Sequence, residues 1–524
     1  MKQFIKRISL ILSIFIFGFV LTSCNGADNK DAQNTNTEVV DNESKDDNAK
    51  TEESAESTKE SQTEESTEKA DSEEETGEDE KASEEESSDA DFAEASTEDV
   101  EKALADDSAI VVDARDNDSY IGWALDGNSR GGHIDGATDF SHYWITGEYD
   151  EEGNLEGESR EEVLAYTMEN KNIAPGKSVI VYDTNGEDAK VVANYFKEKG
   201  IEDISIYDAN EWIADEDKEL VSYPNYEFLL APEKLNDLIE GKEVEAIKDS
   251  ENVKIIDVRW GDNEESGYLD GHIPNAIHIN TDSFEPPMEY VDGIEEWRLT
   301  ADEDLVKLLL ENGITKDSSV VVTSPEPMAA HRFALICKYL GVEDVHVLNG
   351  GFVNYQNKGY ELATGEVEAE AATDFGTEYP ANPDLITTIP ELKEMLDDEN
   401  TTLVDNRTWE EYIGETSGYS YHDKKGRIPG AVFGYAGKGD SSSVSYYRNI
   451  DKTIRNIDEI KDMWKDQGIN TEDKLIFMCG SGWRAAEILN DAAVMGLTDI
   501  TLYSDGWIAW SNEGNPTETG DPTK

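Results

Sequence analysis

Three blocks of the sequence repeat one order of apolar and polar positions. In each block an apolar run ends in an Asp-x-Arg triplet, a glycine-rich turn follows, and a second apolar run leads into a loop and a helical pattern. Short apolar runs bounded by turns are typical of buried strands, and apolar residues three and four apart are typical of helices. We therefore predict three tandem α/β domains, each a mainly parallel sheet flanked by helices. The triplets end the runs VVDAR (111–115), IIDVR (255–259) and LVDNR (403–407).

The later landmarks of the three blocks also correspond. The turns read GGHIDGA, GHIPNA and GRIPGA, and each block closes with a strand and an aromatic-bearing turn, such as ITLYSDGWIAW in the third. These landmarks predict domains at residues 92–222, 229–366 and 378–520. In each Asp-x-Arg triplet we expect the two side chains to bond backbone groups of the adjoining turn, which is a structural role.

The first 91 residues have a different composition. Residues 1–23 combine three basic residues with an apolar stretch that ends before Cys24, and they resemble the signal peptide of a bacterial lipoprotein. We predict that Cys24 is lipidated and that the mature protein is extracytoplasmic and anchored to the cell membrane. An uncleaved membrane anchor is the alternative. Residues 24–91 contain no aromatic residue, which predicts a disordered acidic linker, with a partner-binding tail as the alternative.

Charge excludes several classes of partner. The formal net charge is −74, and about −57 of it belongs to residues 92–524. Nucleic acid and anionic lipid surfaces are poor partners for such a chain. The three cysteines and seven histidines show no metal-ligand spacing, so we predict neither a metal site nor a cofactor.

Cys479 lies in the stretch LIFMCGSGWRAAEILNDAAVMG, whose pattern predicts a strand, a tight loop and a helix. The loop residues Gly480, Ser481 and Gly482 tolerate unusual backbone angles, and successive N–H groups at a helix start favour an anion. A cysteine in such a loop is stabilised as a thiolate and suits nucleophilic chemistry. A buried core cysteine is the alternative interpretation.

The other two blocks help to decide between these interpretations. Aligned on the helices, Asp183 and Ser324 occupy the position of Cys479. A tightly buried apolar position would not accept an aspartate or a serine, so the nucleophile is favoured. The remaining cysteine, Cys337, lies within a helical pattern and is predicted to be a core residue.

Together, the Asp-x-Arg strand ends, the turns and the Cys-to-Arg loop resemble the rhodanese family of sulfurtransferases over essentially all of residues 92–524. The resemblance implies that Cys479 takes sulfane sulfur from a small anionic donor such as thiosulfate as a persulfide, and passes it to cyanide or a thiol. It also implies that the loop backbone and Arg484 bind the donor and that Trp483 shapes access. The two domains without the cysteine would have structural or interaction roles.

Other functions remain open at this point. A cysteine phosphatase of the cell-cycle type has a related fold but a Cys-x5-Arg loop, whereas Cys479 and Arg484 form Cys-x4-Arg. A protease-like pair would need His422, the only histidine of the third domain. A cell-surface interaction or sulfur-carrier protein with little turnover is the third alternative, because two of the three loops lack the nucleophile.

Four further residues are candidates for the entrance of the site. Arg427 replaces the histidine of the other two turns and could attract an anionic donor, although a surface ion pair is the alternative. Tyr419, Tyr421 and Lys438 are the other candidates.

The negative charge leads to a kinetic prediction. An anionic donor such as thiosulfate is repelled at long range by the folded part of the chain, and added salt screens this repulsion. We expect the second-order rate of persulfide formation to rise with ionic strength in stopped-flow or quenched assays. A rate that falls steeply with salt would contradict this electrostatic description.

Overall fold

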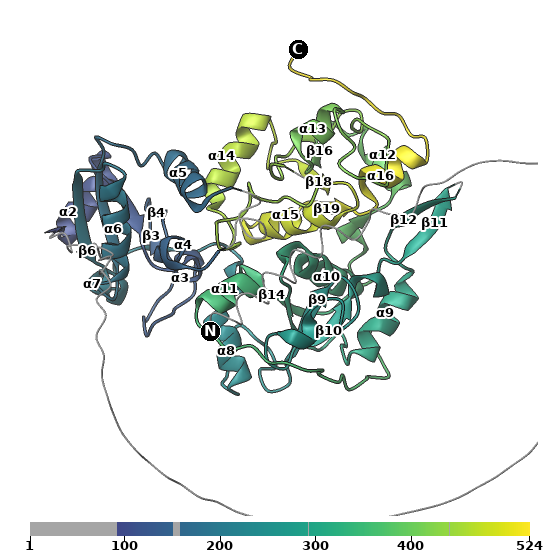
Figure 1. Cartoon of the computed structure of the whole chain (residues 1–524), viewed down its shortest axis with the longest axis horizontal. Helices are drawn as coiled ribbons and strands as arrows, with labels where there is room; N and C mark the ends of the chain where they lie inside the picture. The colour runs from purple at the N-terminus through teal and green to yellow at the C-terminus, as the bar shows by residue number, and fades with distance from the viewer. Residues whose placement is uncertain (1–91, 150–157, 292, 440) are drawn as a thin grey trace, which may run out of the picture. The chain divides into compact units, whose positions relative to one another are not determined.

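The computed structural model describes residues 92–149, 158–291, 293–439 and 441–524, so the predicted signal peptide, Cys24 and the linker lie outside the described part (Figure 1). The described residues belong to one compact unit. They form three repeats, each with a parallel sheet flanked by helices, as the sequence predicted. None of the helices in these ranges is both long and apolar enough to span a bilayer.

The three large sheets share one topology. Numbered along each repeat, the five strands pair side by side in the order 1-5-4-2-3, and all the pairings are parallel. The strand that leads into the candidate loop is therefore central in every repeat. Because the carboxyl ends of parallel strands meet at one edge, the loops after the strands gather at that edge.

The first repeat surrounds the sheet β1-β6-β5-β2-β4. Two short antiparallel strands, β3 and β7, pair the glycine-rich turn of this repeat with the segment at its carboxyl end. The strands are β1 (Ala93–Glu94), β2 (Ile110–Asp113), β3 (His133–Ile134), β4 (Thr138–Asp139), β5 (Ser178–Asp183), β6 (Asp203–Asp208) and β7 (Leu220–Val221), and the helices are α2 (Thr97–Asp106), α3 (Asn117–Ile121), α4 (His142–Thr146), α5 (Arg160–Asn170), α6 (Asp188–Glu198) and α7 (Asn210–Ala214).

The second repeat surrounds the sheet β10-β9-β13-β14-β8 and adds the antiparallel hairpin β11-β12. The strands are β8 (Leu229–Leu230), β9 (Lys254–Arg259), β10 (Ile277–Asn280), β11 (Pro287–Val291), β12 (Ile294–Trp297), β13 (Ser319–Thr323) and β14 (Asp344–Leu348). The helices are α8 (Pro232–Ile239), α9 (Asp302–Glu311), α10 (Pro327–Leu340) and α11 (Gly351–Asn357), with short 3-10 turns η1 (Tyr226–Phe228), η2 (Tyr268–Asp270) and η3 (Thr281–Ser283).

The third repeat surrounds the sheet β15-β19-β18-β16-β17. Its central strand, β18, is buried along nearly its whole length, which explains why it reads as a continuous apolar run. The strands are β15 (Ile386–Thr387), β16 (Thr401–Asp405), β17 (Val432–Phe433), β18 (Lys474–Met478) and β19 (Ile500–Tyr503), the helices are α12 (Ile389–Met395), α13 (Trp409–Ile413), α14 (Ile457–Gln467), α15 (Trp483–Val494) and α16 (Gly506–Asn512), and η4 is Pro383–Leu385.

The Asp-x-Arg triplets end β2, β9 and β16 with buried ion pairs between their own two side chains, which was not predicted, and the predicted bond to the turn is made by the arginine. In the third repeat, Arg407 donates from Nε and Nη2 to the two carboxylate oxygens of Asp405 at 2.8 and 2.6 Å, and Nη2 also donates to the carbonyl of Gly426 at 2.8 Å. The pair thus joins the strand end to the glycine-rich turn. The same bonds recur from Arg115 to Asp113 and Gly132, and from Arg259 to Asp257 and Gly271.

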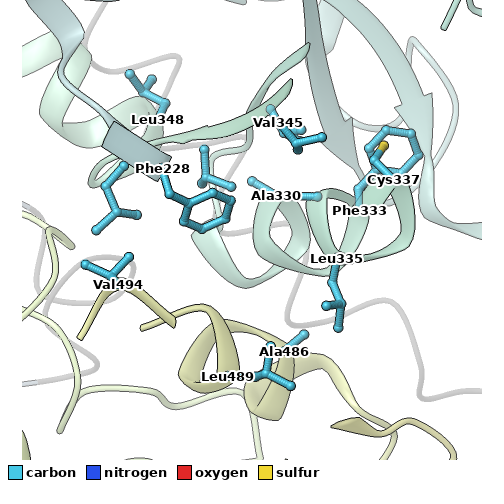
Figure 2. Close-up of a cluster of buried hydrophobic side chains, with 14 of the residues drawn as sticks. Phe228, Ala330, Phe333, Leu335, Cys337, Val345, Leu348, Ala486, Leu489 and Val494 are labelled. Carbon is cyan, nitrogen blue, oxygen red and sulfur yellow. The ribbon is translucent and has the colours of Figure 1, made fainter. Parts of the chain in front are cut away.

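The second and third repeats pack through α10 and α15. Leu335 of α10 points toward Ala486 and Leu489 of α15, and all three side chains are buried in one hydrophobic cluster (Figure 2). The small side chain of Ala486 lets the two helices approach closely. Cys337 is fully buried in the same cluster, which confirms its predicted core role, and burial raises the pKa of its thiol.

Candidate active site

Cys479 follows β18 at the carboxyl edge of the third sheet. Its side chain is only 1% exposed, and α15 begins four residues later at Trp483. The carbonyls of Cys479 and Gly480 accept hydrogen bonds from the backbone N–H groups of Trp507 and Ile508, at 2.8 and 3.0 Å. The aromatic-bearing turn after β19 therefore fixes the position of the loop.

Two loop glycines are required by close approaches. Gly482 has φ +90°, and a Cβ atom there would lie 2.5 Å from the carbonyl oxygen of Ser504. A Cβ atom on Gly480 would lie 1.7 Å from the hydroxyl of Tyr419. A side chain at either position would displace a neighbouring group, so the loop keeps this path only with glycine.

Arg484, at the start of α15, is held by a buried carboxylate. Its Nη1 and Nη2 donate to Oε2 and Oε1 of Glu411 at 2.9 and 3.0 Å, and both side chains are at most 1% exposed. Burial disfavours the charged form of Glu411, but the Arg484 guanidinium outweighs it and keeps the pKa of that carboxyl below its ordinary value. The positive charge at the loop is therefore largely compensated.

Two phenols lie beside this pair. Tyr419 Oη accepts a hydrogen bond from Arg484 Nη2 at 3.1 Å, so its own proton is directed elsewhere. Burial raises the pKa of Tyr419 well above its ordinary value, and it raises the pKa of Tyr421 to about 12 despite the nearby Arg484. Both phenols thus stay protonated at neutral pH and can donate hydrogen bonds to an anionic sulfur.

A cavity of about 360 Å³ opens in front of the loop and belongs to two repeats. From the third repeat, its wall includes Cys479, Ser481, Trp483 and Arg484. The third repeat also supplies Tyr419, Tyr421, Ser441 and Ser442. The second repeat supplies Trp260, Thr281, Asp282, Glu285 and Met328 from segments that follow its parallel strands, and Trp297 from the end of the hairpin strand β12.

The second-repeat side of the cavity is aromatic and acidic. The ring of Trp260 lies 5.1 Å from that of Trp483, and the ring of Trp297 lies 5.1 Å from that of Tyr421. Asp282 adds a carboxylate to this wall. Across the described ranges no group of three or more His, Cys, Asp or Glu side chains is arranged to hold a metal ion.

The structure brings most of the sequence-predicted residues together. Gly480 and Gly482 form the loop backbone, and the other four predicted loop residues, with Tyr419 and Tyr421, line the cavity. Arg427 and Lys438 do not line it. The Arg427 guanidinium donates to the carbonyl of Gly520 at 2.7 Å and pairs with Glu518 at 3.5 Å, which corresponds to the ion pair left as the alternative.

Sequence reasoning missed the contribution of the second repeat. The signal was present, because Trp260 directly follows the IIDVR run and residues 281–285 directly follow the next strand, so both lie at the carboxyl edge of that sheet. It also missed Glu411, the partner of Arg484, which lies 73 residues earlier in the chain.

The equivalent loops of the other two repeats hold carboxylates of their own. In the first repeat, Asp183 Oδ2 accepts a hydrogen bond from the backbone of Ala189 at 3.0 Å, near the start of α6. In the second repeat, Glu326 pairs with Arg448 at 2.6 Å and with Lys452 at 2.9 Å. Burial opposes the ionisation of Glu326, yet Arg448 and Lys452 hold its pKa at about 2. In the third repeat, the loop of residues 479–484 carries the Cys479 thiol and contains no carboxylate.

Comparison with known proteins matches this architecture. The model of the rhodanese-like domain matches residues 96–212, 240–358 and 388–513. The chain belongs to the rhodanese family. It is 34% identical to the thiosulfate sulfurtransferase YnjE of Escherichia coli K12 over 413 residues, which cover 78% of this chain and 89% of that protein. The 3-mercaptopyruvate sulfurtransferase of the same organism is 23% identical over 273 residues, covering 50% of this chain and 90% of the relative.

Solved structures add relatives of a second kind. The anaerobic ergothioneine biosynthesis enzyme from Chlorobium limicola, in complex with its substrate trimethyl histidine, superposes with a TM-score of 0.74 at 32% identity, covering 82% of this chain and all of that one. Another structure of this type, a variant with a cysteine persulfide, contains ergothioneine in a tetrahedral intermediate state, with the same TM-score and identity. These relatives support sulfurtransferase activity and differ in substrate.

The loop geometry gives a test with a matched control. Gly482→Ala places a methyl group against the Ser504 carbonyl, whereas Gly468→Ala has a similar positive φ and no atom within 4 Å. Each substitution carries a backbone cost of about 1 kcal/mol, but only the first moves the cysteine loop.

We expect Gly482→Ala to slow alkylation of Cys479 by iodoacetamide, followed by peptide mass spectrometry, by about tenfold or more. Gly468→Ala should stay close to the parent protein. Equal effects of the two substitutions would show that the loop path does not control the thiol.

Proposed function

We propose that this protein is a sulfurtransferase in which Cys479 carries sulfane sulfur as a persulfide and delivers it to an acceptor in the cavity between the second and third repeats. The observation that supports this proposal is the position of Cys479, on a glycine loop at the wall of a cavity that Tyr419, Tyr421 and Arg484 also line. Thiosulfate is the proposed donor, and cyanide or a thiol is the proposed acceptor.

The proposed reaction has two half-reactions. The Cys479 thiolate attacks the outer sulfur of thiosulfate, the S–S bond of the donor breaks, and sulfite leaves with the bonding electron pair. A nucleophilic acceptor then attacks the outer sulfur of the persulfide, and the Cys479 thiolate leaves. Loop N–H groups and the phenols of Tyr419 and Tyr421 stabilise the anionic sulfur in both steps.

A second acceptor class is favoured by the composition of the cavity wall. Trp260, Trp297, Trp483 and Tyr421 surround the space in front of the sulfur, and Asp282 adds negative charge. Aromatic faces with a nearby carboxylate suit a quaternary ammonium group. We therefore propose, as the second candidate, an imidazole acceptor with a quaternary ammonium group, similar to the trimethyl histidine of the ergothioneine biosynthesis enzyme.

The persulfide itself is the first test. After treatment with thiosulfate or polysulfide, intact-mass analysis should find one added sulfur atom, localised by peptide mapping to Cys479 and absent from Cys479→Ser. Cyanide should remove the sulfur and release thiocyanate. A parent protein with no adduct under any donor would exclude the proposal, and aryl phosphate hydrolysis lost in Cys479→Ser would favour a phosphatase.

The acceptor class is tested with persulfidated protein. If the second candidate is correct, trimethyl histidine should discharge the persulfide and gain one sulfur atom. Trp260→Ala should slow this discharge by about tenfold, because it removes an aromatic face, while Trp260→Phe retains most of the rate. Discharge by cyanide should change little in both variants. If trimethyl histidine is inert and cyanide is active, the first candidate is retained.

We also propose that the protein is exported and anchored to the membrane by a lipid on Cys24, with residues 24–91 as a spacer. This rests on the sequence of residues 1–91 alone. It would place the sulfurtransferase outside the cytoplasm, in contact with exogenous sulfur compounds.

A further inference from the structure

A buried ion pair of the second repeat lies beside the cysteine loop. Arg332, on α10, donates from Nε to Glu285 Oε1 at 2.7 Å, and its Nη2 lies 2.6 Å from the same oxygen. Both side chains are about 1% exposed. Neither residue belongs to the third repeat, and neither was singled out by the sequence.

Each member of this pair also contacts the third repeat next to the loop. Glu285 Oε2 accepts a hydrogen bond from the indole N–H of Trp483 at 2.6 Å, which is the first residue of α15. Arg332 Nη2 donates to Ser504 Oγ at 2.6 Å, and the backbone carbonyl of Ser504 is the group that limits Gly482. One hydrogen bond from the second repeat thus holds Trp483, and another holds Ser504, which contacts the loop at Gly482.

The guanidinium of Arg332 also lies against the backbone of the cysteine loop. A Cβ atom on Gly482 would lie 3.0 Å from Arg332 Nη1. This nitrogen is buried and has no hydrogen-bond partner among the described residues. The other two nitrogens of Arg332 are bonded, so the side chain is fixed against the loop and cannot rotate away without breaking both bonds.

We infer that Arg332 and Glu285 are positioning residues for Cys479: the second repeat, which has no cysteine of its own, holds the cysteine loop and Trp483 in the geometry required for sulfur transfer. Arg332 acts through Glu285 and Ser504, and Glu285 acts through Trp483. The inference deepens the proposed function and rests on it for the transfer step. It assigns a role to the second repeat that sequence reasoning had left as structural or interaction.

The charges around Glu285 set how the pair responds to substitution. Burial raises the pKa of Glu285, and Arg332 and the Trp483 N–H oppose this, while Asp505 adds to it from the turn after β19. Asp505 in turn lies 3.9 Å from Arg298, and Asp282 lies on the cavity wall. Removal of Arg332 leaves Glu285 as a buried carboxylate without its cation, which is strongly unfavourable.

The experiment compares four variants of the full chain: Arg332→Met, Glu285→Gln, the double variant, and Arg448→Met. The last is the matched control, because Arg448 pairs with Glu326 and Glu487 at 2.6 Å across the same two repeats, but at the loop that lacks a cysteine. Urea unfolding reports stability, iodoacetamide alkylation reports the Cys479 thiol, and persulfide discharge reports transfer.

We expect Arg332→Met to slow both alkylation and discharge by about 10- to 100-fold, since small displacements of reacting groups have effects of this size. Glu285→Gln should have a smaller effect in the same direction. Arg448→Met should lower the urea midpoint about as much as Arg332→Met does, because each change leaves a buried carboxylate without its cation, but it should change both rates less than about threefold. A purely structural role would give similar rate losses in Arg332→Met and Arg448→Met, whereas a positioning role gives a large loss only in Arg332→Met.

The pH dependence separates positioning from general destabilisation. In Arg332→Met the unpaired Glu285 is neutral at low pH and ionises as pH rises through its elevated pKa. The rates of this variant, divided by those of the parent protein at the same pH to remove the ionisation of the Cys479 thiol itself, should therefore fall with rising pH. The double variant has no such group, and it should recover rate relative to Arg332→Met above that pKa.

Two outcomes would overturn the inference. One is an unchanged alkylation rate in both Arg332→Met and Glu285→Gln, and the other is an equal loss of alkylation rate in Arg332→Met and Arg448→Met. Alkylation does not require sulfur transfer, so this arm remains decisive even if no donor forms a persulfide, which would remove the proposed function alone.

Discussion

The packing of α10 against α15 is the constraint on which the candidate site depends. The two helices follow equivalent loops of the second and third repeats, and Leu335, Ala486 and Leu489 bury their shared face. Once these helices are in contact, the carboxyl edges of two sheets face one cavity. The thiol comes from one edge, and much of the aromatic and acidic wall comes from the other. Core packing therefore determines which surfaces meet at the sulfur.

The three loops occupy equivalent places in their repeats but carry different side chains. The first contains Asp183, the second contains Glu326 with its two cationic partners, and the third contains Cys479. Of these side chains, only the thiol of Cys479 gives a strong nucleophile when it is deprotonated, whereas the carboxylates of Asp183 and Glu326 are bound to neighbouring groups.

The sequence predicted the strand, loop and helix order because parallel strands buried on both faces read as apolar runs, and it predicted Cys479 because the chemistry of its loop is local. It did not predict the partner of Arg484, because Glu411 and Arg484 meet only through the fold. The same holds for Arg332 and Glu285: no local pattern specifies which face of one repeat contacts the next. For Arg427 a local pattern was misleading. Its place in the glycine-rich turn suggested a role in attracting an anionic donor, but its guanidinium is bound to Gly520 and Glu518.

The loop that contains Glu326 could not be made reactive by a single substitution. Its carboxylate pairs with Arg448 and Lys452, and the prolines at 325 and 327 stand in place of the glycines of the cysteine loop. A change of Ser324 to cysteine would meet an occupied, stiffened loop and two cations already committed elsewhere. A reactive cysteine in the second repeat would therefore require several changes at once: a cysteine at position 324, glycines in place of Pro325 and Pro327, and removal of the Glu326 carboxylate from the loop.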